Sequence, residues 1–333
     1  MRDRVMLATL GLHPARVRRL LSDWGSAAAV LRAIRIGQID VAPSVRDRLG
    51  VDGDELVRQS GATVLPREKC PAGLGELPDA PDVLFVRGHV PAGPSVAIVG
   101  TRAATAYGLE VAQRFGRAVG RAGWPVVSGL ARGIDGAAHR GCLEAGGIAV
   151  GVLGCGVDVA YPPEHGALMQ DVLNGGGAIL SEYAAGSPPE PWRFPPRNRI
   201  ISGLASVVVV VEAGVKGGAL ITAARALEQG RLVLAVPGDI DRPTSRGCNL
   251  LIRDGAHPVL DVDDLLTSLT FAMGDPPAGR TDPPLVSLLE GGDQTIEELA
   301  VGLETTYADV LRRVGRLEVA GIARSTDGVV MLR

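Results

Sequence analysis

Small residues and arginines stand together at the first two places where an apolar run gives way to a helical pattern. The first turn is Gly100-Thr101-Arg102, and the second is Ser128-Gly129 with Arg132 close behind. Glycine lets a ligand approach the backbone, a helix start favours anions, and arginine can hold a phosphate with two hydrogen bonds. Two such turns at one sheet edge predict a ligand with several phosphates. For the first turn alone, a tight turn with a surface arginine is nearly as good an explanation.

A longer glycine-rich turn precedes the helical pattern that begins near Ala219. It contains Lys216, one of the two lysines in the chain, then Gly217 and Gly218, with Thr222 one helical turn further on. The segment resembles a phosphate cradle, but it lacks the G-x-x-x-x-G-K-[ST] pattern of a P-loop. We expect it to add backbone amides and a positive charge to the same site.

A proline-rich segment from Ser187 to Arg199 is the most unusual part of the sequence. Aromatic residues make up only 3% of the chain, yet Trp192 and Phe194 stand close together here among arginines. Aromatic rings stack bases and arginines pair with phosphates, the combination that single-stranded nucleic acid requires. A loop whose aromatic side chains plug the sheet edge is an equally good explanation. The polar residues expected to contact the strand are Arg197, Asn198 and Arg199.

Three further side chains belong to types that take part in catalysis. Asp135 and His139 are four residues apart, so on a helix they would share a face and could act as an acid and base pair. Capping and packing of that helix is the preferred explanation. Cys155 could be a nucleophile, but no histidine is placed to activate it. No cluster of metal ligands is evident, and the sequence predicts no catalysis, no cofactor and no metal.

Apolar β-rich runs alternate with alanine-rich helical runs between about residues 82 and 265. Continuous valine, isoleucine and leucine indicate strands buried on both faces, as in a parallel sheet covered by helices. The predicted fold is α/β, a doubly wound, mostly parallel Rossmann-like sheet. The expected strands are Ser95–Val99, Pro125–Val127, Ile148–Leu153, Ala178–Leu180, Val207–Val211, Leu232–Val236 and Pro258–Leu260. The expected helices are Tyr107–Ala122, Gly133–Ala145, Pro163–Asn174, Asn198–Leu204 and Ala219–Gln229.

The regions before and after this alternating segment have different sequence patterns. Residues 1–75 favour a small helical module, whose first 50 residues hold nine arginines and four aspartates. A solvated scaffold and a basic binding module explain that charge equally well. We assign residues 76–270 to the Rossmann-like domain and the proline- and glycine-rich residues 271–284 to a linker. Residues 285–333 favour three helices and a hairpin, which make a winged helix, with DNA binding no better supported than partner or dimer contacts.

The composition excludes several classes of protein. With 46% hydrophobic and 21% charged residues the chain is globular, and a net charge of -3 excludes a uniformly basic nucleic-acid binder. No apolar stretch is longer than the five residues of Val207–Val211, far fewer than the ~20 residues that span a bilayer. We expect neither a membrane anchor nor a signal peptide. Four scattered cysteines without a C-x-x-C pair indicate a reducing cytoplasm.

Together these motifs resemble the DNA-processing protein A family. The matching segments run in order through VGTR, SGLARGID, LGCGVDVAYPPEH, SEY, FPPRNRIISGLA, VVEA, GGALITAARALEQGR and VPGDIDRPTSRGCNLLIRDGA. They cover about Val96 to Pro258. The family often has an N-terminal sterile-alpha-motif-like or helix-hairpin-helix module and a C-terminal winged helix. Many relatives have serine where Gly218 stands here, which removes a hydroxyl contact and keeps the backbone amide.

The resemblance implies a cytoplasmic bacterial protein that binds incoming single-stranded DNA during natural transformation, protects it and helps to load the RecA recombinase. It also implies a homodimer, which here would use Leu250, Leu251 and Ile252. Phosphates would then meet Gly100, Thr101, Ser128, Gly129, Gly217 and Gly218, with charge from Arg102, Arg197, Arg199 and Lys216, and Phe194 would stack a base. Such binding tolerates any base sequence and is sensitive to salt.

Two enzymatic alternatives remain from related Rossmann-like folds. The first is a nucleotide-binding enzyme like the lysine-decarboxylase-like phosphoribohydrolases, which hydrolyse the N-glycosidic bond of nucleotides and whose mark is P-G-G-x-G-T-x-x-E. The nearest counterpart, Lys216 to Thr222, has Arg225 where that motif has its glutamate, so the acid/base carboxylate is missing. A dinucleotide-dependent dehydrogenase is weaker still, because no G-x-G-x-x-G follows the first strand.

Overall fold

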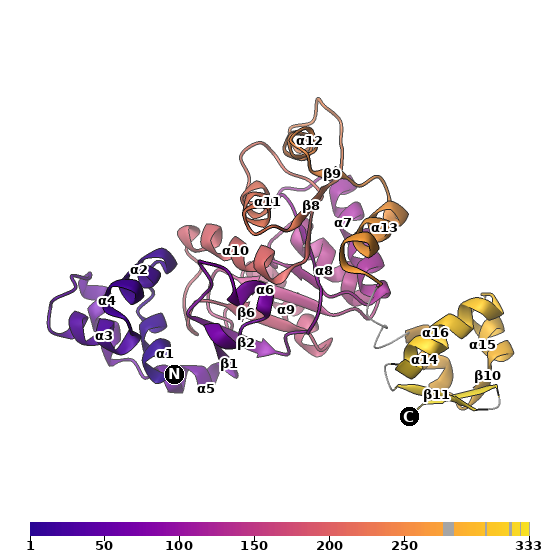
Figure 1. Cartoon of the computed structure of the whole chain (residues 1–333), viewed down its shortest axis with the longest axis horizontal. Coiled ribbons are helices and arrows are strands. Elements are labelled where there is room, and N and C mark those ends of the chain that lie inside the picture. Colours follow the sequence, from indigo (N-terminus) through magenta and orange to yellow (C-terminus); the bar gives the residue numbers. More distant parts are fainter. Residues whose placement is uncertain (276–282, 304, 320–321, 327, 333) are drawn as a thin grey trace.

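Short runs of valine, isoleucine and leucine form the centre of a nine-stranded sheet (Figure 1). The computed structural model describes residues 1–275, 283–303, 305–319, 322–326 and 328–332. The parallel strands are β3 (Val96–Val99), β4 (Val126–Ser128), β5 (Ala149–Leu153), β6 (Ala178–Ser181), β7 (Val207–Val210), β8 (Leu232–Ala235) and β9 (His257–Pro258). Nearly every residue of β3 to β8 is buried, which confirms the prediction of a mostly parallel sheet covered on both faces.

The strand order is β1-β2-β6-β5-β4-β3-β7-β8-β9. From β3 the chain adds β4, β5 and β6 on one side, then crosses back and adds β7 and β8 on the other. The switch point between β3 and β7 leaves a crevice at the carboxyl ends of these two strands, where doubly wound proteins bind their ligands.

Helices cover the sheet on two faces, each with its own hydrophobic core. One face carries α7 (Ala106–Ala122), α8 (Ile134–Glu144), α9 (Gly166–Asn174) and α13 (Val262–Met273). The other carries α6 (Ala72–Gly75), α10 (Phe194–Leu204), α11 (Gly218–Glu228) and α12 (Arg246–Arg253). Short 3-10 turns stand at η2 (Arg67–Lys69), η3 (Pro163–His165) and η4 (Pro191–Arg193). The α/β/α layering confirms the Rossmann-like prediction.

An antiparallel edge completes the sheet and was not predicted. Strand β2 (Val83–Gly88) pairs antiparallel with β6, and β1 (Thr63–Pro66) pairs antiparallel with β2. The chain therefore enters the sheet at Thr63, inside the segment that we assigned to the helical module. The buried run Val83 to Val86 meets the criterion used for the other strands, so β2 could have been found from the sequence.

Three helices of this domain also differ from what the sequence predicts. α10 begins at Phe194 rather than Asn198, because Pro195 and Pro196 occupy its first turn, where proline is tolerated. α12 was not predicted. α13 runs to Met273 and overlaps the expected linker, whose residues 276–282 lie outside the described residues.

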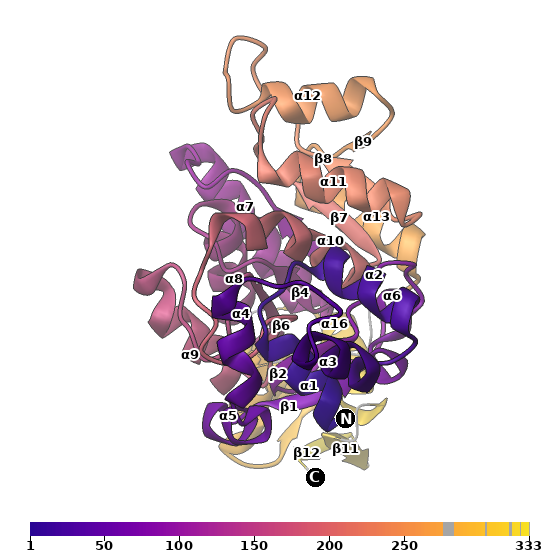
Figure 2. The ribbon, with the colours of Figure 1, turned by 90° about the vertical axis from the view of Figure 1, so that its left-hand side faces the viewer.

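Most apolar side chains of the N-terminal helices pack in a hydrophobic core of their own. These helices form a small unit that faces the viewer in Figure 2. They are α1 (Arg2–Thr9), α2 (Pro14–Trp24), α3 (Ala27–Arg35), α4 (Pro43–Asp47), the 3-10 turn η1 (Arg48–Gly50) and α5 (Gly53–Ser60). α1 attaches the unit to the sheet, since Val5 is buried in the main core and Arg4 pairs with Glu68 at 2.8 Å and with Asp82 at 3.5 Å.

The C-terminal residues form a third unit around their own core. Its helices are α14 (Pro283–Glu290), α15 (Ile296–Gly302) and α16 (Tyr307–Val319). Its strands β10 (Gln294–Thr295), β11 (Ala323–Thr326) and β12 (Val329–Leu332) make an antiparallel sheet in the order β10-β12-β11. No helix in the described ranges is both long and apolar enough to cross a bilayer.

Helices α7 and α8 pack with their backbones in direct contact, because glycines stand where they cross. A methyl group at Gly116 would overlap the carbonyl of Ala138, and one at Gly141 would overlap the carbonyl of Gln113. This close approach fixes α8, whose first turn follows the second phosphate-type turn of the sequence.

Gly141→Ala should destabilise the protein by about 1–3 kcal/mol, because the added methyl forces the two helices apart. Urea unfolding would measure the change. Gly166→Ala is the matched control in α9, where the methyl would meet only Ala160 at 3.7 Å. It should leave stability unchanged or slightly raised. Equal stability of the two variants would contradict the close packing of α7 on α8.

Candidate nucleic-acid interface

A cleft of about 700 Å³ opens at the switch point between β3 and β7. Ten of the fourteen binding residues expected from the sequence line it. They are Gly100, Thr101, Arg102, Phe194, Arg197, Asn198, Lys216, Gly217, Gly218 and Thr222. The sheet edge therefore brings together three loops that are far apart in the sequence.

The glycine-rich loop after β7 supplies a helix start that faces this cleft. α11 begins at Gly218, and in the part of the chain that the structure describes no side chain caps its N-terminus. Asn198 Nδ2 and Thr222 Oγ1 both donate to the Gly218 carbonyl, at 3.1 Å and 3.2 Å. These bonds fix the loop through its carbonyl oxygen. The Leu220 amide donates to the Gly217 carbonyl at 3.1 Å. The amides of Gly218 and Ala219, which have no partner among the described residues, remain for an anion.

The exposed positive charges of the cleft are Arg102 and Lys216. The Arg102 guanidinium carbon lies 4.9 Å from the centre of the Phe194 ring, a cation–π contact. The Tyr161 ring lies 5.3 Å from the same ring, at 36°. Phe194 is thus held between a cation and a second aromatic ring while part of it stays accessible in the cleft.

Arg197 forms the floor of the site rather than a free charge. It is buried, and its Nη1 donates to the carbonyls of Gly129, at 2.8 Å, and of Val152, while Nε donates to Asn198 Oδ1 at 3.3 Å. Burial lowers the pKa of Arg197 to about 10, and nearby Asp135 opposes that shift. The guanidinium remains charged at neutral pH and joins the ends of β4 and β5 to α10.

Asp135 is buried opposite Arg197 and accepts a hydrogen bond from the Gly129 amide at 3.0 Å. Burial raises the pKa of Asp135, and the charge of Arg197 works against that rise. Gly129 lies between the two, because any side chain there would overlap both the guanidinium and the carboxylate. Gly129 and Asp135 hold the turn in place, and of this pair only Asp135 lines the cleft.

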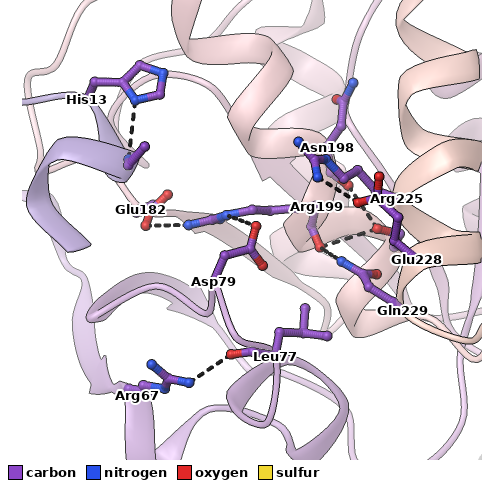
Figure 3. Close-up of polar contacts among 12 residues, drawn as sticks. His13, Arg67, Leu77, Asp79, Glu182, Asn198, Arg199, Arg225, Glu228 and Gln229 are labelled. Atoms are coloured by element: carbon purple, nitrogen blue, oxygen red, sulfur yellow. Dashed lines mark hydrogen bonds and ion pairs between the residues drawn. The ribbon is translucent and has the colours of Figure 1, made fainter. Parts of the chain in front are cut away.

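The remaining expected residues lie outside the cleft. Ser128 is buried and donates to the Ile98 carbonyl at 2.6 Å, and Arg132 is exposed and paired with Glu164. Arg199 is buried and points to the opposite side of α10, where it pairs with Glu182 at 2.7 Å and Asp79 at 3.5 Å (Figure 3). These contacts join secondary-structure elements and give Ser128 and Arg199 structural roles.

Glu212 is an important residue of the site that our sequence analysis did not single out. Its buried carboxylate accepts bonds from the backbone amide and hydroxyl of Thr105, at 2.9 Å and 2.7 Å. Its backbone carbonyl accepts from the Thr101 amide at 2.8 Å. The residue therefore joins the end of β7 to the Gly100 turn and to the N-cap of α7. A charged residue at the end of a buried valine strand was the available signal.

Leu130 is the second residue that was missed. It has a positive φ of 52°, which is rare for a residue with a side chain, and its side chain is buried. It packs on Gly151, where any side chain would overlap it, and its carbonyl accepts from His165 Nδ1 at 2.8 Å. These contacts hold the SGLARGID turn in shape, and the sequence alone has no pattern that predicts them.

Asp135 and His139 do not form the acid and base pair that was considered as an alternative. His139 is fully buried, and its Nε2 lies 3.1 Å from the Val150 carbonyl oxygen. Cys155 is buried too, its Sγ is bonded to the Val159 carbonyl, and burial raises the pKa of the thiol to about 12. The preferred packing role of His139 agrees with this geometry.

His139→Gln should remove a pH dependence of stability. Burial lowers the pKa of His139 from 6.5 to about 4. Below pH 6.5 this histidine is protonated in the unfolded chain but stays neutral in the folded protein. The free energy of unfolding is therefore highest above that pH and decreases as the pH falls. The loss from this group between about pH 7 and about pH 5 is ~2 kcal/mol.

Glutamine can still donate to the Val150 carbonyl but does not titrate. Urea unfolding of the parent protein and the variant at both pH values gives the difference in slope. If the two proteins lose the same stability on acidification, His139 does not remain neutral in the folded state.

Proteins of one family are similar to this chain. The model of the DNA recombination-mediator protein A family matches residues 62–270. The chain is 41% identical to protein Smf of Escherichia coli over 276 residues, which is 77% of this chain and 73% of that protein. It is 42% identical to a DNA-processing protein of Mycobacterium tuberculosis over 246 residues, 70% of this chain and 63% of that protein.

Two solved structures are also similar. The DNA processing protein A of Streptococcus pneumoniae has a TM-score of 0.66 and 33% identity, covering 80% of this chain and 98% of that one. The corresponding Helicobacter pylori protein, described for its single-stranded DNA binding mode, has a TM-score of 0.57 and 27% identity, covering 64% of this chain and 98% of that one. The chain therefore belongs to the DNA recombination-mediator protein A family.

Proposed function

We propose that this protein binds single-stranded DNA in the switch-point cleft, largely without regard to base sequence. The observation that carries the proposal is the joint presence of Arg102, Phe194 and the uncapped start of α11 in one cleft. Arginine and backbone amides contact phosphates, whichever base follows, and an aromatic ring stacks any base. The relatives named for DNA processing, and the one described with single-stranded DNA, support it.

Exposed and buried residues of the cleft would have different roles in binding. Exposed Arg102 and Lys216 supply phosphate contacts, together with the amides of Gly217 and Gly218. Arg197, which cannot leave its carbonyl partners without losing buried hydrogen bonds, acts from beneath as a fixed positive charge. Because a duplex keeps its bases stacked inside, the ring of Phe194 favours an unpaired strand.

The hydrolase alternative has less support. Within the described ranges, Asp135 is the one carboxylate that lines the cleft, and it is already bonded to the Gly129 amide and faces Arg197. A general acid or base needs a proton that it can exchange with the substrate. We therefore propose binding without catalysis.

The wider role that we propose is that of a mediator in the cytoplasm. The protein would protect DNA taken up during natural transformation and help to load RecA on it. The family to which the chain belongs is named for mediating recombination, which supports this role. The C-terminal unit, with three helices and a three-stranded sheet, fits a winged helix with a contact role of its own.

We also propose a homodimer through α12. Leu251 and Ile252 pack partly against the core beneath them, and Leu250 stays partly exposed beside them. Two more apolar side chains lie exposed in the neighbouring loops, Ile240 at 80% and Leu260 at 74%. Apolar surface of this kind is typical of an interface.

Arg102→Ala and Phe194→Ala should each weaken binding of a fluorescent oligothymidylate by about tenfold, measured by anisotropy. The loss of one phosphate contact in Arg102→Ala should also lower the salt slope by about 1. Arg140→Ala is the matched control, since Arg140 is exposed on α8 and does not line the cleft. If all three variants bind alike, the cleft is not the DNA site.

Leu250→Arg should convert a dimer to a monomer in analytical ultracentrifugation, because it places a charge in the proposed apolar contact. Val301→Arg changes an equally apolar residue that is 79% exposed on α15 and should leave the dimer intact. A Leu250→Arg variant that stays dimeric would rule out α12 as the interface.

A further inference from the structure

We propose that the DNA strand continues out of the cleft onto a seam between the N-terminal helices and the α/β domain, where His13 and Trp192 bind further nucleotides. This inference rests on the proposed function, because it extends the same strand. It assigns the N-terminal unit a binding role that depends on two side chains far apart in the sequence. We call this surface the His13–Trp192 seam.

The seam is built from two exposed rings. Trp192 belongs to η4 and is 36% exposed, and His13 is the exposed N-cap residue of α2. Their ring centres are 5.5 Å apart, and the two ring planes are tilted by 31°. Tyr183 meets Trp192 edge-on at 6.0 Å. Aromatic rings that already contact one another form a platform on which a base can stack without ordering new side chains.

A buried arginine holds the platform. Arg193 is 2% exposed, and its guanidinium carbon lies 5.0 Å from the ring centres of both Trp192 and Tyr183. Its Nη1 donates to the Pro188 carbonyl at 2.8 Å. Glu190 accepts from Trp192 Nε1 at 2.5 Å and lies 3.5 Å from Arg193 Nε, so the carboxylate that holds the Trp192 ring is balanced by the arginine.

The seam continues directly from the cleft. Pro189, Pro191 and Phe194 line the cleft, and Trp192 stands between the last two in the same loop. A strand that stacks a base on Phe194 and passes over Pro191 therefore arrives at Trp192. Because Trp192 and Phe194 are only two residues apart in the chain, neighbouring nucleotides of one strand can contact both.

The chemistry of His13 suits a phosphate. Its Nδ1 accepts the Ala15 amide at 3.2 Å, as Figure 3 shows at the start of α2. With that nitrogen acting as an acceptor, the ring hydrogen is on Nε2, which is free to donate to a phosphate oxygen. The exposed Arg18 and Arg19 follow on the same helix and add positive charge.

The test compares a short and a long oligothymidylate, of about 6 and about 20 nucleotides, in anisotropy titrations with the full chain. The short strand fills only the cleft, and the long one also reaches the seam. Trp192→Ala and His13→Ala should leave the short strand's affinity unchanged and weaken the long strand's by about tenfold for Trp192→Ala and less for His13→Ala. Trp24→Ala is the matched control, a tryptophan with the same 36% exposure at the far end of α2.

Each other outcome would contradict the proposal that DNA binds the His13–Trp192 seam. Equal losses for both strands would mean that Trp192 only positions the cleft loop, and no loss for either would mean that the seam is not used. A similar loss in Trp24→Ala would point to a non-specific effect. Failure of the proposed function would give a different result, because Arg102→Ala would then leave the affinity for the short strand unchanged.

Discussion

A buried arginine is the constraint on which the rest of this site depends. Arg197 donates to carbonyls at the ends of two strands and to Asn198, whose amide in turn holds the Gly218 carbonyl. One guanidinium thus sets the positions of α10, the strand ends and the start of α11. Its charge is balanced by buried Asp135, and removing one member of such a pair is far more destabilising than replacing both. The exposed groups that meet a ligand rest on this fixed floor.

The division between buried and exposed cations explains how a chain with a net charge of -3 can bind a polyanion. Arginines that are buried, such as Arg193, Arg197 and Arg199, organise the loops and the platform of rings. A small number of exposed cations then act with helix-start amides in a concave site, where local potential rather than net charge governs binding. Gly129 completes the arrangement, because any residue with a side chain at this position would overlap both Arg197 and Asp135.

Much of the fold and of the candidate site could be predicted from the sequence. Continuous valine runs marked the parallel strands, and the rule that ligands bind at their carboxyl ends placed ten expected residues in one cleft. The directions of the side chains were harder to predict. Arg197 and Arg199 are two positions apart on α10 and must face different sides, a fact that helix geometry alone could have supplied. The positive φ of Leu130 and the contact of His13 with Trp192 depend on packing between distant segments, for which the sequence carries no local signal.

Selection of an unpaired strand depends on the accessible Phe194 ring and on phosphate contacts that are independent of base sequence. The most direct measurement is competition, in which unlabelled single-stranded DNA and a duplex of the same length each displace a labelled oligothymidylate from the full chain. We expect the single strand to displace the labelled oligothymidylate at a far lower concentration than the duplex, with little dependence on base sequence. Equal displacement by both would contradict it, because a duplex offers the same phosphates without free bases.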